Sequence, residues 1–245
     1  MTSAQLYDTI GTTYTTTRRT DPRIAAQIWA ALGDARTVVN VGAGSGSYEP
    51  TDRVVLAVEP SEVMRSQRPR EAAPSLAAAA EHLPFETGTF DAAMAVSTVH
   101  HWQDPIAGLR EMKRVAGRAV VFTFDLSNLN RFWLTRDYLP ELTGTLVGRP
   151  SLSEQAQAIG ARIEPVLIPW DCEDGFFEAY WRRPEAYLDE HVRRGISIWA
   201  KLGPDIEQRA VRNLRDDLAS GRWAERNRDL GGLDAADLGL RLLIA

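Results

Sequence analysis

Residues 38–64, VVNVGAGSGSYEPTDRVVLAVEPSEVM, decide how the rest of the chain is interpreted. The run 37–41 is short, apolar and rich in β-branched residues, which is typical of a buried strand in a parallel sheet. It leads into GAGSG at 42–46, where three glycines let the backbone turn sharply and approach a ligand closely. A second apolar run, 53–58, ends on Glu59. We therefore predict a glycine loop and a carboxylate together at the carboxyl edge of a sheet, where open α/β sheets bind ligands.

The glycine pattern argues against a nicotinamide-binding domain. The dinucleotide fingerprint G-x-G-x-x-G would place its third glycine at position 47, which is Ser47. A carboxylate at the end of the neighbouring strand can still accept both hydroxyls of a ribose, so Glu59 indicates a nucleoside ligand. The alternative is that the glycines serve only the tight packing of strand and helix.

The G-x-G-x-G pattern resembles the first motif of the class I S-adenosylmethionine (SAM) methyltransferases, with Glu59 as their acidic ribose residue. Glu-Pro-Ser-x-x-Met follows at 59–64. Further on, AEHLPF at 80–85 and Phe90-Asp91 resemble the D-A-E-x-L-P-F … F-D segment of the same family. The resemblance covers about residues 37–125 and is strongest to the small-molecule group that includes ubiquinone-biosynthesis and trans-aconitate methyltransferases.

The resemblance implies an α/β fold with a Rossmann-like, seven-stranded, mostly parallel sheet and helical insertions that form a cap. The last strand of this family runs antiparallel between strands five and six. We find no internal repeat or flexible linker, so we expect one domain over 1–245. Its expected parts are a helical lead-in at 1–32, a core at 33–125, 160–170 and 235–245, and cap insertions at 126–159 and 171–230.

Residue patterns predict the individual elements. Asp21-Pro22 is typical of an N-cap followed by the first turn of a helix, and Gly33 ends that helix. Ala116-Gly117 is expected to form a short turn. Ser151 or Ser153 should cap a helix that ends before Gly160. The expected strands are 37–41, 53–58, 76–80, 90–96, 119–124, 162–169 and 239–244, and the main helices are 22–32, 61–67, 106–115, 184–200 and 204–219.

The family resemblance also implies the cofactor, SAM, its product S-adenosylhomocysteine, and the residues that bind them. A leading Tyr14-x-x-x-Arg18 element would fold over the cofactor and meet its carboxylate, with Arg19 as a substitute. Two positions depart from the family: Asn40 replaces an aspartate before the glycine loop, and Ala79 replaces the acid that often faces the adenine. The full expected set is Tyr14, Arg18, Asn40, Gly42, Ala43, Gly44, Gly46, Glu59, Pro60, Met64, Ala80, Glu81 and Ser97.

His100 and His101 follow the predicted central strand, where the family places the reacting methyl group. Imidazole titrates near neutral pH, so either side chain could be a catalytic base. We expect His101 to act, because Trp102 can pack beside it. Alternatively, the pair only braces the turn. We expect no metal site, since adjacent histidines point apart and no zinc-binding spacing is present.

Composition narrows the function further. The net charge is −5, which counts against a nucleic-acid substrate because nucleic-acid binders usually carry a basic face. Cys172 is the only cysteine, so neither an intrachain disulfide nor a cysteine metal cluster can form. With no signal segment or apolar span, we expect a cytoplasmic protein that does not enter membranes, as a monomer or homodimer.

The sequence thus predicts a SAM-dependent methyltransferase that acts on an oxygen, nitrogen or carbon atom of a small-molecule acceptor. The acceptor should lie between the turn 97–102 and the helices of 126–200, which contain the aromatic groups 132–138 and 176–181. Two alternatives remain open. One is a tRNA or protein methyltransferase, and the other is a cyclase, regulator or scaffold that has the fold without the reaction.

Overall fold

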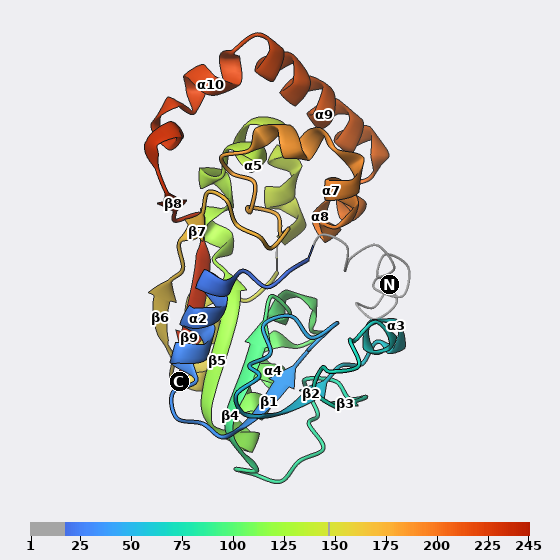
Figure 1. The fold of residues 1–245 in the computed structure, drawn as a ribbon, viewed down its shortest axis with the longest axis vertical. Coiled ribbons are helices and arrows are strands. Elements are labelled where there is room, and N and C mark those ends of the chain that lie inside the picture. Colours follow the sequence, from blue (N-terminus) through green and yellow to red (C-terminus); the bar gives the residue numbers. More distant parts are fainter. Residues whose placement is uncertain (1–17, 147) are drawn as a thin grey trace.

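The computed structural model describes residues 18–146 and 148–245 and contains a seven-stranded sheet with strand order β3-β2-β1-β4-β5-β9-β6 (Figure 1). All neighbours pair in parallel except β9, which runs antiparallel between β5 and β6. This is the sheet that the sequence predicts. The strands are β1 Thr37–Val41, β2 Val54–Val58, β3 Ser75–Leu76, β4 Phe90–Val96, β5 Ala116–Phe124, β6 Arg162–Pro165, β7 Ile168–Pro169, β8 Ala235–Ala236 and β9 Leu240–Ile244.

Helices cover both faces of the sheet, as its apolar central strands require. Alternate residues of a strand point to opposite faces. On one face, Val38 and Met94 share a core with Ile24 and Ile28 of α2. The other face packs against α4 and α6. The helices are α2 Pro22–Ala31, α3 Glu62–Ser66, α4 Pro105–Val115, α5 Trp133–Tyr138, α6 Leu152–Ile159, α7 Glu190–Arg194, α8 Ser197–Leu202, α9 Pro204–Ala219 and α10 Arg222–Arg226, with 3-10 turns η1 Val99–His101, η2 Leu126–Arg131, η3 Pro140–Leu146, η4 Pro184–Leu188 and η5 Arg228–Gly232.

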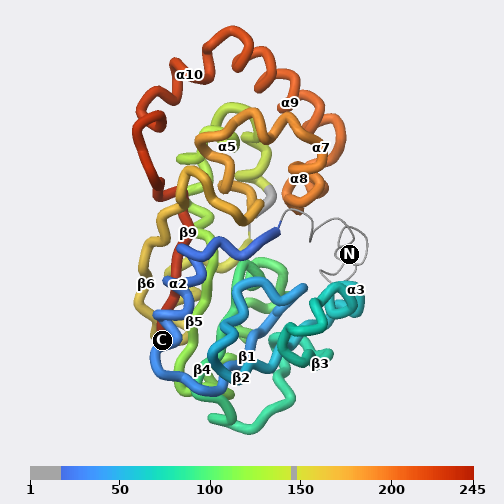
Figure 2. Tube along the Cα trace, in the orientation of Figure 1, coloured from blue at the N-terminus to red at the C-terminus, as the bar shows by residue number. Residues whose placement is uncertain are grey.

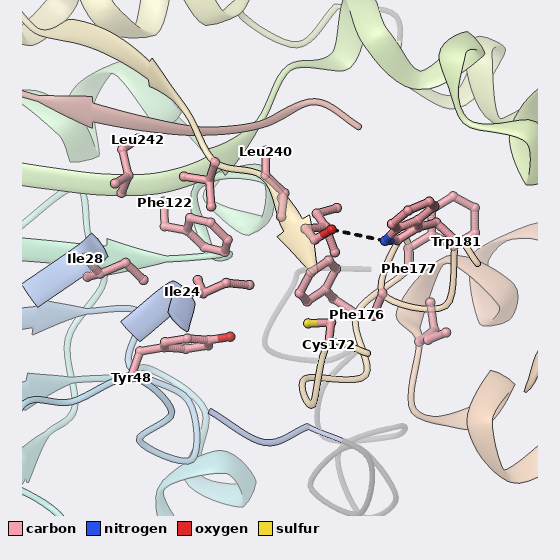
Figure 3. Close-up of a cluster of buried hydrophobic side chains, with 14 of the residues drawn as sticks. Ile24, Ile28, Tyr48, Phe122, Cys172, Phe176, Phe177, Trp181, Leu240 and Leu242 are labelled. Atoms are coloured by element: carbon pink, nitrogen blue, oxygen red, sulfur yellow. Dashed lines mark hydrogen bonds between the residues drawn. The ribbon is translucent and has the colours of Figure 1, made fainter. Parts of the chain in front are cut away.

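Helix α3 lies at the edge of the sheet near β3, whereas α5 and α7 to α10 gather beyond one end of the sheet, with α9 and α10 forming an arch across the top of the view (Figures 1 and 2). Their apolar side chains belong to the same buried cluster as the α2 face of the sheet. Figure 3 shows Phe176 and Trp181 beside Leu240, with Phe122 and α2 on the far side. The Trp181 indole donates to the Ile168 carbonyl at 3.1 Å. The helical part and the sheet therefore share one continuous core.

Several predicted elements differ in extent from the observed ones. Of the predicted strand 76–80 only Leu76 pairs with β2, together with Ser75 just before it. The predicted strand 162–169 breaks after Pro165, and its end pairs with β8 in a second, two-stranded sheet. Ala116-Gly117 is not a turn, because β5 begins directly after α4 at Ala116.

The helical insertions also need correction. The predicted helix 184–200 is three short elements, because Asp189 caps a new helix and Gly195 ends it. Ser151 forms a capping box with Glu154, as one of the two alternatives predicted. The helix it begins, α6, was assigned to the cap but packs against α4 on the sheet. Below, "helical cap" means residues 126–146 and 171–230.

Within the part of the chain that the structure describes, no helix is long and apolar enough to cross a membrane.

Glu178 is a carboxylic acid inside the helical cap. The residue is 3% exposed, and its Oε2 has no hydrogen-bond partner among the residues described. Burial disfavours the charged form and raises the pKa of Glu178 to about 8, although the positive charge of Arg18 opposes the shift. The side chain is therefore neutral at neutral pH.

This burial predicts a pH-dependent stability. The pKa of Glu178 is higher in the folded protein than its ordinary value of 4.5, so the folded state holds the proton more tightly. The resulting stabilisation is complete below that ordinary value and is lost as pH rises through about 8. Wild type should lose more stability between about pH 6 and about pH 9 than Glu178→Gln, as measured by urea denaturation. The exposed Glu185→Gln should behave as wild type, and parallel losses in all three proteins would refute the assignment.

Candidate functional site

The carboxyl ends of β1, β2 and β4 meet around a cavity of about 630 Å³. Of the site residues predicted from the sequence, twelve line it: Arg18, Asn40, Gly42, Ala43, Gly44, Glu59, Pro60, Met64, Ala80, Glu81, Ser97 and His101. Gly46 and His100 are not among its lining residues, and Tyr14 lies outside the described residues. None of the described residues of 126–200 lines this cavity.

The loop after β1 depends on glycine at Gly42. This residue has φ 70°, a conformation that side chains disfavour. A Cβ there would lie 2.2 Å from Thr98 Oγ1, so the loop after β1 could not approach the turn after β4. Gly44 also has a positive φ, 53°, and its amide donates to Glu59 Oε2 at 2.8 Å. The loop is thus tied to the end of β2 and packed against the end of β4.

Glu59 holds its carboxylate at the floor of the cavity with two backbone hydrogen bonds. Its Oε1 accepts from the Ser61 amide at 2.9 Å, and its Oε2 accepts from Gly44. The residue is 8% exposed, and burial raises its pKa, while the two amides and nearby arginines oppose the rise. Each carboxylate oxygen can accept more than one hydrogen bond. Glu59 therefore keeps acceptor capacity for a ligand.

A buried ion pair supports the glycine loop from below. The Asn40 amide donates to Glu49 Oε1 at 3.0 Å, and Arg68 donates to both Glu49 oxygens at 2.8 Å. Arg68 also donates to the Gly44 carbonyl at 3.2 Å. No sequence motif marks Glu49 or Arg68, so neither was predicted to lie near the site. Their network supplies a carboxylate beside Asn40, the position at which the expected aspartate is absent.

Two polar atoms at the cavity have no hydrogen-bond partner among the described residues. They are Asn40 Oδ1 and Ser97 Oγ, and both are buried. Ser97 has φ 51°, which is uncommon for a residue with a side chain, and residues in such strained conformations cluster at active sites and ligand-binding loops. Unsatisfied buried acceptors and donors are costly. These atoms are suited to bind a polar ligand.

The rings of His100 and His101 in the turn η1 lie 3.8 Å apart between centroids, so they do not point apart as the sequence analysis expected. His101 lines the cavity, whereas His100 packs edge-on against Phe124, with 5.8 Å between the ring centroids. Burial, helped by the charges of Lys201, Arg149 and Arg18, lowers the pKa of His100 to about 3. The same causes, together with His100, hold the pKa of His101 well below its usual value. Both rings are neutral at neutral pH, and of the two only His101 lines the cavity.

Glu81 and Trp102 form the opposite wall of the cavity. Glu81 Oε1 accepts from the amides of Gln103 and Asp104, at 2.8 and 3.1 Å. Trp102 packs so tightly on α4 that a Cβ at Gly108 would lie 2.5 Å from its ring. Glu81 therefore stabilises the turn that follows Trp102. Ala79 and Ala80, next to Glu81 in the chain, also line the cavity.

Arg18 connects the cavity to the helical cap. Its guanidinium pairs with the Asp174 carboxylate through Nε at 2.6 Å and Nη2 at 3.0 Å. The same carboxylate accepts from the Tyr48 hydroxyl at 3.0 Å. Arg18 is a predicted site residue, whereas Asp174 and Tyr48 were not predicted from the sequence. Their pairing is a contact between distant segments that no local pattern indicates.

Comparison with known proteins agrees with this geometry. A family model described as a methyltransferase domain matches residues 39–122, and no curated protein sequence matches the chain. A solved structure from Anabaena variabilis, assigned as a methyltransferase from an antibiotic biosynthesis pathway, is 32% identical. The alignment covers 94% of this chain and 98% of that one, with a TM-score of 0.85.

Two further structures share the fold at low identity. The YcgJ protein of Bacillus subtilis is 19% identical over 91% of this chain and 95% of that one, with a TM-score of 0.50. Geranyl diphosphate C-methyltransferase from Streptomyces coelicolor is 17% identical over 91% and 77%, also with a TM-score of 0.50. Its structure contains Mg²⁺, geranyl diphosphate and S-adenosyl-L-homocysteine. These two likenesses show the fold. The family model and the Anabaena structure show that the chain belongs to the class I SAM-dependent methyltransferases, whose cofactor is SAM.

Proposed function

We propose that this methyltransferase acts on an oxygen, nitrogen or carbon atom of a small molecule. The observation that carries the proposal is the cavity itself, where the glycine loop, Glu59, Ser97 and His101 converge. Its volume of about 630 Å³ lies in the range of small-molecule sites, which is roughly 300–1,000 Å³. The full-length likeness to a protein from an antibiotic biosynthesis pathway supports an acceptor of this kind.

The residues around the cavity fit SAM. We assign the ribose hydroxyls to Glu59, which is already oriented by the Gly44 and Ser61 amides. The unpartnered Asn40 Oδ1 is an acceptor for the ammonium group, and Glu49 next to it provides negative charge. Arg18 lies at the cavity for the carboxylate. The remaining predicted residues at the cavity, from Pro60 to Glu81, would surround the adenine.

Bound SAM supplies an activated methyl group, so the protein needs mainly to align the acceptor with it. The backbone turn at Ser97 and the tight approach of Gly42 to Thr98 hold the two loops of the reaction centre in one arrangement. His101, neutral at neutral pH, would take the proton that an oxygen or nitrogen acceptor releases. We place the acceptor between His101 and the helical cap.

We expect Glu59→Ala to weaken SAM binding by about 1.5–3 kcal/mol, the scale of a hydrogen bond to a charged group. Calorimetric titration of wild type and variant with SAM measures this. Glu62→Ala is the matched control, because Glu62 is an exposed acid three residues further on at the start of α3. Its affinity should equal that of wild type. Absence of binding to wild type at millimolar SAM would contradict the proposed function.

We expect the two histidine variants to behave differently. His101→Ala should lower turnover by about 10²–10⁴, the usual worth of a general base, and leave SAM affinity nearly unchanged. His100→Ala should mainly lower the thermal midpoint, because its ring packs against Phe124 outside the cavity lining. Turnover, SAM affinity and thermal midpoint of both variants are compared once an acceptor is in hand. Full activity in both variants would remove histidine from the mechanism.

A further inference from the structure

The side-chain amide of Asn40 can bind Glu49 in only one of its two orientations. Asn40 lies in β1 and is 1% exposed, and its Nδ2 donates to Glu49 Oε1 at 3.0 Å. A carboxylate has only acceptor atoms, so the amide must turn its nitrogen, and not its oxygen, toward Glu49. Asn40 Oδ1 therefore points away from Glu49. This oxygen is buried and has no hydrogen-bond partner among the residues described, and Asn40 lines the cavity whereas Glu49 does not.

Arg68 in turn holds the Glu49 carboxylate in place. Its Nη2 lies 2.8 Å from each carboxylate oxygen of Glu49, and its Nη1 donates to the Gly44 carbonyl at 3.2 Å. The side chains of Arg68 and Glu49 are only 5% and 8% exposed. Arginine keeps its charge in proteins and has donors alone, so it matches the carboxylate fully. A buried and matched ion pair therefore sets the direction of the Asn40 amide.

The ion pair also lies where the fold lacks a common support. Parallel neighbouring strands are usually joined through a helix, but residues 42–53, which connect β1 and β2 and are all described, contain none. Support of this loop would explain the ion pair by itself. It would not explain why Asn40 Oδ1 is left unpaired beside the cavity, since an unsatisfied buried acceptor is costly. A ligand that donates an N–H to this oxygen would remove that cost.

We propose that Glu49 is a positioning residue for the ammonium group of the cofactor. It fixes the Asn40 amide so that Oδ1 faces the cavity and accepts a hydrogen bond from the ammonium. The inference rests on the proposed function, which assigns the ammonium to Asn40, and extends it to Glu49 and Arg68, which do not line the cavity. The hydrogen bond from Nδ2 to a carboxylate also polarises the amide and makes Oδ1 a stronger acceptor.

The test compares two ligands that differ only in the ammonium group. They are S-adenosylhomocysteine and its deaminated analogue, in which a hydrogen atom replaces that group, and each is titrated into the full chain by calorimetry. Wild type should bind S-adenosylhomocysteine about tenfold tighter than the analogue or better, the scale of a hydrogen bond to a charged group. Asn40→Ala should remove most of this preference and leave the affinity for the analogue unchanged.

The double variant Glu49→Met/Arg68→Met removes both members of the ion pair, so that neither charge is left buried alone. It should bind S-adenosylhomocysteine about fivefold more weakly and the analogue as before, because nothing then orients the Asn40 amide. Adding Asn40→Ala to it should weaken binding no further than Asn40→Ala alone, since groups that act through one another are not additive. Glu49→Asp keeps the charge but withdraws the carboxylate by one methylene group, and it should show the same selective loss.

Glu207→Met/Arg193→Met is the matched control. Arg193 and Glu207 form a partly buried ion pair in the helical cap, with 2.6 Å between Arg193 Nε and Glu207 Oε1, and neither residue lines the cavity. This variant should bind both ligands as wild type does.

The outcomes separate this inference from the function on which it rests. If wild type binds S-adenosylhomocysteine and the analogue equally well, the inference is overturned and the proposed function stands. The same holds if neither the double variant at Glu49 and Arg68 nor Glu49→Asp shows a selective loss, because a pair that only supports the loop would affect both ligands alike. If wild type does not bind S-adenosylhomocysteine, the proposed function fails and the inference falls with it.

Discussion

The buried Asp174 carboxylate joins three parts of the chain that are far apart in sequence. It accepts two hydrogen bonds from Arg18 and one from Tyr48. A buried charge that loses its partner typically costs about 3–5 kcal/mol, so the three groups remain together in the folded protein. Arg18 lines the cavity and Tyr48 closely follows the glycine loop, so the cap loop at 174 is bonded to one residue of the site and to one residue beside it. The geometry of the cavity therefore depends on this contact.

The sheet could be predicted from the sequence because its signals are local and repeated. Buried parallel strands such as β1 and β4 are short apolar runs, and the glycine loop follows the first of them directly. Local sequence patterns do not predict strand boundaries that depend on which strands pair with each other. Nothing within residues 162–169 indicates that β6 pairs with β9 while β7 pairs with β8. The spacing of apolar residues predicted one helix over 184–200. Asp189 interrupts it, because its side chain caps the start of a new helix, α7.

In the candidate site, too, the sequence predicts the residues of local motifs but not the residues that come together only on folding. Residues carried by contiguous motifs, such as Gly42, Glu59 and Ser97, line the cavity as expected. The groups that hold them were missed, because Glu49 and Arg68 meet only after folding. The sequence does not predict which of the two adjacent histidines faces the cavity. In the folded protein His101 lines it, whereas His100 packs against Phe124. Asn40 lacks the charge of the aspartate that it replaces, and the neighbouring Glu49 provides a carboxylate there instead.

The continuous core constrains how a protein of this architecture can acquire new acceptors during evolution. Phe122 and Leu242 of the sheet belong to the same buried cluster as Trp133, Trp181 and Tyr187 of the helical cap. A cap from a relative could not be exchanged as a module, because its aromatic side chains would have to match those of β5 and β9. Residues that line the cavity, such as Gln103, lie outside that cluster and can change singly without disturbing it. Divergence in this lineage is therefore expected to proceed by point substitutions at the rim of the cavity, while the cap and sheet are inherited as one unit.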